Sequence, residues 1–561
     1  MEKSNNLWAR FKESGYALRT LVSLLGGSIV AFILFYVFLP PINLMSVGFW
    51  VYFTVCLTVY MLPFIVVNGP GKFITFSVNG GAEKTKSVGG IKLKKWQIIS
   101  ILVPIAVIFL GMLVSSEVFN AKAYSEIIDV KDYNFAEDMP EADEVTNIAL
   151  MDTDSAMIFG NRVLGSLSDM VSQYTVSSYY TQINYKKTPK KVSNLEYDGF
   201  FKWLGNRENG IPGMVMVDPV DTGAEYIAFD KPIHYAESGF FGDDLERKLR
   251  FEYPTKIFHS ISFEVDDECN PYYIVACSRP QVMLFGASDI TEVIIFNATT
   301  GESEIMPVGS VPSWVDIVYT GGLACQKYNW YGTLSGGFIN SIIGNVGCKQ
   351  ATDDFGYIVL DDDVWYFTGV TSMVSDDKSN IGFILTNART GEYKFYPVIG
   401  AEEQSAMAAA EGEVQEKGYV ASFPSLISVA EQPTYIMVLK DATGVVKLYA
   451  LVNVENYSIV TTATTQAAAM NAYKKLLHQN GTAEDSEALE ATVTVERVDV
   501  VTVAGLATVY ITATDGNVYK GYLDTDESLI LVGVGDKLNI TYSEGSTEKI
   551  YVISSWSFAE E

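Results

Sequence analysis

The chain reads LVSLLGGSIVAFILFYVFL from Leu21 to Leu39, VGFWVYFTVCLTVYMLPFIVV from Val47 to Val67, and IISILVPIAVIFLGMLV from Ile98 to Val114. None of these three apolar runs contains a charged residue. At a rise of about 1.5 Å per residue, about 17 to 25 apolar residues match a hydrocarbon layer of about 30 Å. The sequence therefore predicts that residues 1–116 form a membrane anchor with three transmembrane helices.

The positive charges of the anchor predict its orientation. Four Lys and Arg residues precede the first run and six lie between the second and the third, whereas the connection Pro40–Ser46 carries no charge. Because Lys and Arg stay on the cytoplasmic side, the amino terminus and the loop before Ile98 are expected inside the cell. After three crossings, the chain beyond Ser116 is expected to be extracytoplasmic.

The charge balance of the remaining chain excludes one class of partner. Residues 117–561 hold 29 Lys and Arg against 64 Asp and Glu. Such a negative field repels nucleic acid. We therefore predict no nucleic-acid partner, and we expect the lipid bilayer and other envelope or membrane proteins as partners.

An internal repeat indicates how the exterior is built. Asn297–Val308 (NATTGESEIMPV) and Asn387–Val398 (NARTGEYKFYPV) agree at seven of twelve positions. Each segment reads as strand, tight turn and strand, with glycine supplying the positive φ that the turn needs. Looser copies occur at Asp221–Gly223 and Asp441–Gly444. We therefore expect several antiparallel hairpins of one type.

Two further patterns complete the α+β prediction. The stretches 402–415 and 465–478 favour helices. After a linker at 479–490, short β-rich runs recur at even spacing, which suggests a small C-terminal barrel or sandwich, and the order of the runs resembles a β-barrel of OB type. The expected strands are Thr492–Val503, Ala507–Thr514, Val518–Leu523, Leu529–Val532, Lys537–Tyr542 and Lys549–Ser554.

The stretch from about Asn147 to Leu477 carries a family resemblance. Its motifs are Ile158–Arg162 (IFGNR), Phe200–Leu204 (FFKWL), Gly210–Gly213 (GIPG), Asn380–Phe383 (NIGF) and Pro433–Tyr435 (PTY). With these motifs the chain resembles an uncharacterised family of membrane-anchored proteins from Firmicute bacteria. The helix-plus-hairpin units also resemble PepSY-type modules, which implies an extracytoplasmic role in inhibition or regulation. The resemblance brings no catalytic residue.

These observations predict five regions along the chain. They are the anchor at 1–116, an extracytoplasmic α+β region at 117–245, a first PepSY-like hairpin region at 246–400, a second PepSY-like hairpin and helix region at 401–480, and the barrel at 488–561.

The cysteines allow disulfides without requiring them. The chain has five cysteines, of which Cys56 lies in the second apolar run. Cys269 with Cys277, and Cys325 with Cys348, could form bridges on the oxidising side of a membrane. Buried free thiols are the alternative.

Two groups of residues suggest ligand sites. An aromatic set could line a groove for a peptide or a glycan, although core packing explains such residues more often. It consists of Tyr328, Trp330, Tyr331, Trp365 and Tyr366. The carboxylates of 266–268, 353–354 and 361–363 could hold Ca²⁺, although no EF-hand spacing is present, and solvated turn ends are the alternative. We predict no other cofactor or metal and no catalytic residue.

These features predict a non-enzymatic binding, scaffold or regulatory protein of a Gram-positive cell envelope that acts through protein contacts. Two alternatives remain open at this point: a cell-envelope hydrolase for peptide or polysaccharide, and an accessory subunit of a membrane complex.

Overall fold

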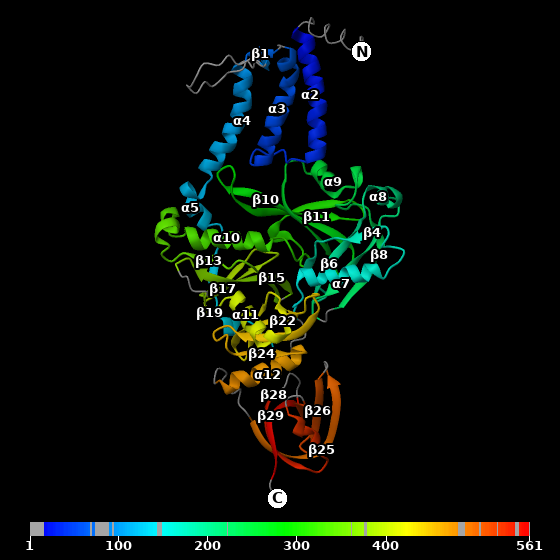
Figure 1. Cartoon of the computed structure of the whole chain (residues 1–561), viewed down its shortest axis with the longest axis vertical. Coiled ribbons are helices and arrows are strands. Elements are labelled where there is room, and N and C mark those ends of the chain that lie inside the picture. The colour runs from blue at the N-terminus through cyan, green and yellow to red at the C-terminus, as the bar shows by residue number, and fades with distance from the viewer. Residues whose placement is uncertain are drawn as a thin grey trace.

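The computed structural model describes residues 16–67, 70–72, 89–91, 95–142, 148–220, 223–360, 362–374, 379–480, 489–503, 506–523, 526–544 and 549–559. Figure 1 shows apolar helices at one end of the molecule, a body of helices and sheets in the middle, and a small barrel at the other end. This mixed composition confirms the α+β prediction.

The three apolar runs form the helices α2 (Tyr16–Phe38), α3 (Val47–Val67) and α4 (Lys95–Val114). Within the described residues, only Thr20–Phe38 is long and apolar enough to span a membrane by itself. Helix α4 counts as a second span only when it is joined to α5 (Glu117–Ser125) across a bend of 55°.

By this criterion of length and apolar composition, the described residues contain fewer membrane-spanning helices than the three predicted. The described apolar stretch of α3 ends at Met61, and the clean apolar run of α4 is short before the chain bends. Strands β1 (Pro70–Lys72) and β2 (Gly89–Ile91) pair between α3 and α4. Most of the basic loop on which the orientation depends lies outside the described residues.

Four mainly antiparallel sheets form the body. Their strands are β4 (Tyr174–Val176), β5 (Thr181–Tyr185), β6 (Thr188–Tyr197), β7 (Ile211–Asp218) and β8 (Gly223–Ile233); β9 (Ile257–Val265), β10 (Pro271–Val282), β11 (Gly286–Asn297) and β12 (Ser303–Pro307); β13 (Lys349–Ala351), β14 (Gly356–Leu360), β15 (Asp363–Ser372), β17 (Gly382–Asn387), β18 (Tyr393–Tyr396) and β3 (Val130–Asp132); and β20 (Val420–Ala421), β21 (Ser425–Val429), β22 (Gln432–Lys440), β23 (Val446–Asn453) and β24 (Val460–Ala463). The short strands β16 (Ser379–Asn380) and β19 (Gly400–Ala401) pair separately.

A helix precedes each sheet, and the four helices are α7 (Thr153–Gly165), α9 (Leu245–Glu252), α10 (Gly321–Leu334) and α11 (Glu403–Glu413). We call each helix with its sheet a module and number the modules 1 to 4 along the chain. The remaining helical segments are α6 (Phe135–Asp138), α8 (Phe200–Asn206), η1 (Phe241–Asp243), η2 (Val308–Ser310), the π-helix η3 (Asn340–Gly344), η4 (Gln415–Lys417) and α12 (Gln466–Gln479). Helices α11 and α12 confirm the two helices predicted from the sequence.

One backbone contact recurs in all four modules. The turn before the last strand of each main sheet presents a carbonyl group to the segment that leads into the module. These carbonyl groups belong to Pro219, Ala298, Ala388 and Val454, and they accept from the amides of Leu150 and Met151, His234 and Tyr235, Val318 and Tyr319, and Ala401. The repeat seen in the sequence therefore extends to four copies of one architecture.

The turns of modules 2 and 3 share their internal hydrogen bonds as well. The Oδ1 atom of Asn297 accepts from two amides of its turn, and Asn387 does the same ninety residues later. Asp441–Gly444, predicted as another copy, instead joins β22 to β23, whereas the equivalent turn of module 4 begins at Asn453. The residues that favour a tight turn can join several different strand pairs of a sheet. The turn sequence therefore does not show which strands of the module it connects.

The sheets pack in two pairs. Sheets 1 and 2 enclose a core that includes Val192, Trp203 and Phe296, and sheets 3 and 4 enclose another with Phe367 and Tyr435. The predicted region 246–400 therefore contains sheets 2 and 3, which belong to different cores. Figure 1 shows the paired sheets beneath the apolar helices.

The C-terminal barrel closes in the order β25 (Leu489–Val503), β26 (Leu506–Ala513), β27 (Val518–Tyr522), β29 (Ile550–Phe558) and β28 (Lys537–Glu544). Strands β27 and β29 are parallel, and β28 pairs with β25 to complete the barrel. The strand predicted at Leu529–Val532 is instead the 3₁₀ helix η5 (Glu527–Leu531), because the carboxylate of Asp526 caps it by accepting from the Ser528 amide. The prediction of a small barrel is confirmed.

Candidate functional site

Helix α9 connects module 2 to the first apolar helix. The carboxylate of Asp244 caps its first turn, and Leu245 and Leu249 are fully buried on the side facing the body. On the opposite side, the ring of Phe251 meets those of Phe35 and Tyr36 of α2 at centroid distances of 5.5 and 6.2 Å. The amphipathic pattern of α9 therefore serves two partners, the body core and α2.

Arg247 adds a polar link at the same place. Its guanidinium group lies 4.4 Å from the ring centroid of Tyr36, a distance typical of a cation–π contact. It also donates to the carbonyl groups of Tyr36 and Phe241, at 3.4 and 3.0 Å. Arg247 thereby ties the last turns of α2 to the body.

The loop between α2 and α3 extends this first joint. The amide of Ile42 donates to the carbonyl of Pro254 over 2.7 Å, and the side chain of Asn43 donates to the carbonyl of Thr255 over 2.9 Å. Both acceptors follow α9 directly. More than two hundred residues of sequence separate the two sides, so only the tertiary fold brings them together.

A second joint fixes the end of α4 to the β10–β11 hairpin. The hydroxyl oxygen of Ser115 accepts from the amides of Leu284 and Phe285, at 3.1 and 3.0 Å. The hydroxyl of Tyr124 donates to the Ser115 carbonyl over 2.7 Å. Gly111 allows the close approach, because a Cβ atom there would lie 2.4 Å from the Phe285 ring.

The second joint makes a specific prediction. Replacing Ser115 by alanine leaves the amides of Leu284 and Phe285 without their acceptor, which is expected to cost roughly 1–3 kcal/mol locally. Hydrogen exchange in the β10–β11 turn should accelerate at least several-fold, measured by mass spectrometry on the full chain in a lipid nanodisc. Ser115→Thr keeps the hydroxyl and serves as the control. Unchanged exchange in Ser115→Ala would contradict the assignment of this joint.

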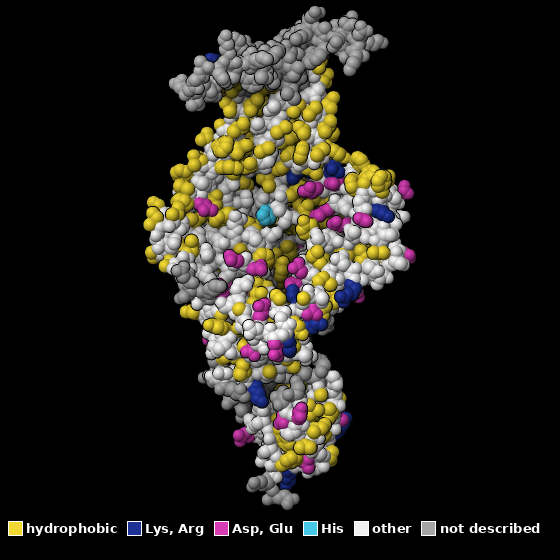
Figure 2. All heavy atoms as spheres, in the orientation of Figure 1, with side chains coloured by type: hydrophobic (Ala, Val, Ile, Leu, Met, Phe, Trp, Pro, Cys, Tyr) yellow, Lys and Arg dark blue, Asp and Glu magenta, His cyan; other side chains and the backbone are white. Residues whose placement is uncertain are grey.

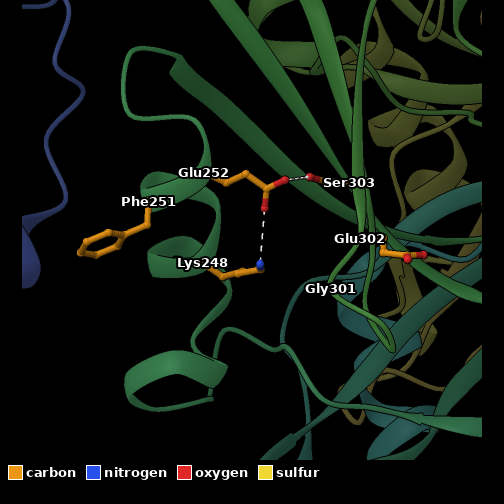
Figure 3. Close-up of a pocket in the computed structure, with 6 residues that line it drawn as sticks. All are labelled: Lys248, Phe251, Glu252, Gly301, Glu302 and Ser303. Carbon is orange, nitrogen blue, oxygen red and sulfur yellow. Dashed lines mark hydrogen bonds and ion pairs between the residues drawn. The ribbon is translucent and has the colours of Figure 1, made fainter.

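Two recesses flank α9. The larger, of about 600 Å³, is lined by Lys248, Phe251, Glu252, Gly301, Glu302 and Ser303. Figure 3 shows Lys248, Glu252 and Ser303 pointing toward one another, whereas Phe251 points away toward α2. Lys248 pairs with Glu252 at 3.5 Å, and the Ser303 hydroxyl donates to the same carboxylate. The charges are thus already engaged with each other, and the recess can accept a polar group only by exchanging these contacts.

The second recess, of about 370 Å³, lies on the other side of α9. Its lining combines Tyr36 of α2 with Phe240, Phe241, Asp244 and Arg247 of module 2. Burial raises the pKa of Asp244, although the Arg247 amide and guanidinium oppose this effect. The joint between the helices and the body is therefore bordered by mixed aromatic and charged surface, which suits contact with another molecule better than bond-breaking chemistry.

A buried carboxyl pair joins modules 1, 2 and 3. Glu264 of β9 is fully buried and accepts from the amides of Asp316 and Ile317, at 2.8 and 3.0 Å. Asp316, itself 4% exposed, accepts from the amide of Asn184 over 2.7 Å. The Asn184 side chain then donates to Asp362 of module 3. Burial raises the pKa of Glu264 to about 7, and burial with the neighbouring Glu264 raises that of Asp316.

The raised pKa values predict a pH-dependent stability. An unfolded glutamate ionises near pH 4.3, whereas folded Glu264 stays protonated until about pH 7. Because the folded state binds more protons in this window, stability falls as the pH rises from about 4.5 to about 7 and then levels off. We expect a melting temperature several degrees higher at pH 5 than at pH 7.5, measured for the full chain in nanodiscs.

The matched variant for this prediction is Glu264→Gln, which cannot titrate. Its melting temperature should change less between pH 5 and pH 7.5 than that of the wild type. If the two slopes are equal, the pH dependence arises elsewhere, for example from the general excess of negative charge.

The predicted aromatic groove is divided among different cores. Tyr328, Trp365 and Tyr366 are 1%, 6% and 4% exposed and belong to three separate clusters. Tyr331 packs beside Tyr328, whereas Trp330 donates to Glu117 and stacks edge-on against Tyr124 in the second joint. These side chains therefore hold sheets and helices together and do not meet at one surface.

All five cysteines are free thiols, which corrects the suggested bridges. Cys269 lies in the turn before β10 and Cys277 is the seventh residue of that strand. At about 3.3 Å per residue, this separation far exceeds the Cα distance of a disulfide, which stays below about 7 Å. The thiol of Cys348 donates to the Thr333 carbonyl, and Cys325 lies on α10, where burial raises its pKa to about 12.

The acidic clusters are occupied by turns and ion pairs. Asp266 accepts from the amides of Glu268 and Asn270, and Asp363 pairs with Arg389. Residue 361 lies outside the described residues. Within the part of the chain that the structure describes, no group of three or more His, Cys, Asp or Glu side chains is arranged to hold a metal ion. Calcium binding therefore stays a prediction without a described site.

Neither the joints nor the carboxyl pair could be derived from sequence patterns. Ser115 and Glu264 are single polar residues whose partners lie far away in the chain. The one available signal was the i, i+4 spacing of Arg247 and Phe251, which places both on one face of a short amphipathic helix but does not identify the partner.

No protein-family model matches the chain, and no curated protein matches it. Solved structures that match include two mutants of the Synechocystis apocarotenoid oxygenase, each 10% identical to this chain. The matches cover 52% and 54% of this chain and 62% and 67% of those chains, with TM-scores of 0.16 and 0.17. At such TM-scores the likeness carries no argument about fold or activity.

Proposed function

We propose that this protein is a membrane-anchored extracytoplasmic binding, scaffold or regulatory protein of the bacterial cell envelope, which acts through protein contacts of its modules. The observation that carries the proposal is the pair of joints. A passive tether needs only one helix and a flexible linker, whereas here α2 and α4 are each bonded to module 2. The body is thus held in a defined orientation relative to the helices, as a scaffold requires.

The exposure of the apolar helices supports membrane anchoring. Only 6% of the Thr20–Phe38 stretch is buried inside the protein, and Ile29 and Phe38 are 63% and 72% exposed. Figure 2 shows many apolar side chains, in yellow, at the surface of these helices. Water disfavours such a surface, at roughly 25 cal/mol for each Å². The proposal places the amino terminus in the cytoplasm and the body outside, with Thr20–Phe38 as the span.

The modular body supports a role in contacts. The body repeats one helix-plus-sheet architecture four times, which supports the proposal that its PepSY-like modules act through contacts with other proteins. The barrel fits the OB type in its strand order, which is first, second, third, fifth and fourth, with the third and fifth strands parallel. The acidic charge of the exterior disfavours nucleic acid, so we assign the barrel to protein contact.

The orientation is tested by cysteine labelling in intact cells. In a variant without its native cysteines, Tyr457→Cys places a thiol on an exposed turn of module 4. A membrane-impermeant maleimide should label it in intact cells, whereas Lys84→Cys in the basic loop should react only after permeabilisation. The reverse pattern would overturn the proposed orientation.

The function itself is tested by cross-linking in intact cells, extraction in mild detergent and isolation through the C-terminus. We expect a reproducible envelope or membrane protein cross-linked to the modules or the barrel, and loss of this product when residues 489–559 or the outer module surfaces are changed. Isolation of the chain alone would contradict the scaffold proposal.

A further inference from the structure

An exposed aromatic surface lies beside the end of α2. Phe201 and Leu204 of α8 are 82% and 50% exposed, and Phe241 of η1 is 57% exposed. The ring of Phe200 connects them, with centroids 5.5 Å from Phe201 and 6.5 Å from Phe241. We call Phe200, Phe201, Leu204 and Phe241 the aromatic patch. Large apolar side chains that gather at a surface mark a contact site, because their exposure to water is unfavourable.

The position of the patch identifies what it contacts. Phe241 lines the same recess as Tyr36, and Arg247 donates to the carbonyl groups of both residues. Tyr36 belongs to the last turn of α2, which ends at Phe38. The patch therefore lies at the depth where α2 would leave the hydrocarbon layer. Aromatic side chains concentrate at this depth in membrane proteins.

Two further points lie at the same level. Helix α5 turns by 55° from α4 and exposes Val118 and Phe119, at 50% and 66%. Met283, at the tip of the β10–β11 hairpin next to the Ser115 joint, is 63% exposed. Figure 1 shows α5, the hairpin and α8 spread across the ends of the apolar helices. Figure 2 shows apolar side chains at the left and at the right of the body, below those helices. The aromatic patch, α5 and the tip of the β10–β11 hairpin thus mark one plane across the ends of the apolar helices.

The charges near the patch are engaged within the protein. The guanidinium group of Arg207 lies 5.0 Å from the ring centroid of the buried Trp203 and pairs with Asp243 at 3.5 Å. The strongly acidic exterior opposes broad attraction to anionic lipid, so the contact depends mainly on apolar insertion at the three points.

We propose that the aromatic patch, together with Phe119 and Met283, inserts into the boundary between headgroups and acyl chains of the outer leaflet, so that the body rests on the membrane. This inference depends on the proposed membrane anchoring and deepens it. The surface around α9 is then partly covered by lipid, and protein partners approach from modules 3 and 4 and from the barrel.

The experiment uses nitroxide labels on single cysteines in the otherwise cysteine-free full chain, in nanodiscs of phosphatidylcholine and phosphatidylglycerol. The accessibility of each label to oxygen, which enters lipid, is compared with that to a water-soluble nickel chelate. Phe201→Cys is the test position. Ile33→Cys, on the exposed side of α2, reports the anchor, and Tyr457→Cys reports bulk water.

We expect the oxygen-to-nickel ratio at positions 33 and 201 to exceed that at position 457 several-fold. A lipid-like ratio at 33 with a water-like ratio at 201 overturns the docking of the patch and leaves the anchor intact. A water-like ratio at 33 overturns both the membrane anchor and this inference. Because Phe201 is exposed, its replacement leaves the core of the body unchanged.

Discussion

Replacing Gly391 by alanine is expected to destabilise the body by about 3–4 kcal/mol. Gly391 occupies the turn of module 3 with φ = +73°, and a Cβ atom there would lie 2.7 Å from the Tyr319 ring. Tyr319 is 6% exposed and faces the buried amine of Lys327 at 4.8 Å, so its ring has little room to move. The substitution adds a clash to the cost of a left-handed backbone. Urea unfolding of the full chain in detergent measures the effect.

Gly418→Ala is the matched control for this substitution. Gly418 has φ = +63°, and among the described residues no atom lies within 4 Å of the position of its Cβ. Gly418→Ala should therefore reduce the unfolding free energy only by the cost of a left-handed backbone at a residue with a side chain, about 1 kcal/mol. The difference between the two variants isolates the contact between the turn and the segment before α10. Equal losses would contradict the role of that contact in the module.

Trp203→Ala is expected to cost about 3–5 kcal/mol, the range for large aromatic residues in a core. Trp203 is 1% exposed, packs against Phe240 and Phe241 at 5.4 and 5.8 Å, and donates to Asp243 over 3.1 Å. Its loss removes the support of the aromatic patch and leaves Asp243 without this donor. The unfolding free energy and the nickel accessibility of a label at 201 should both change.

Phe201→Ala separates packing from surface contact. The Phe201 side chain is 82% exposed, so its removal should change the unfolding free energy in detergent by less than about 1 kcal/mol. If Phe201→Ala destabilised the protein as much as Trp203→Ala, the patch would be part of the core and not a lipid contact. Trp203→Phe keeps an aromatic ring and should lose less than Trp203→Ala.

The two proposals give the molecule a single orientation. Module 2 carries both joints, so it connects the apolar helices to the other modules. Figure 1 places the barrel at the far end from the apolar helices. A partner that binds the barrel would thus be held away from the membrane surface.

Local patterns predicted those elements whose stability depends on neighbouring residues. Apolar runs produced α2, α3 and α4, and helix-favouring composition produced α11 and α12, because propensity and periodicity act over one or two turns. The Asn–Gly turns of modules 2 and 3 were recognisable for the same reason, since Asn297 and Gly301 form their hydrogen bonds within five residues.

The longer-range features depend on contacts that no local pattern encodes. Val318 and Tyr319 bond to a turn seventy residues later, Glu264 bonds to a loop fifty residues away, and Asn43 bonds to residue 255. Such contacts form only when whole sheets pack, because their energy depends on excluding water from a core assembled by distant segments. Chain composition and short spacing therefore specify the apolar helices, the hairpins and most barrel strands. The fourfold module, the joints to the helices, the buried carboxyl pair and the free state of the cysteines arise from packing alone.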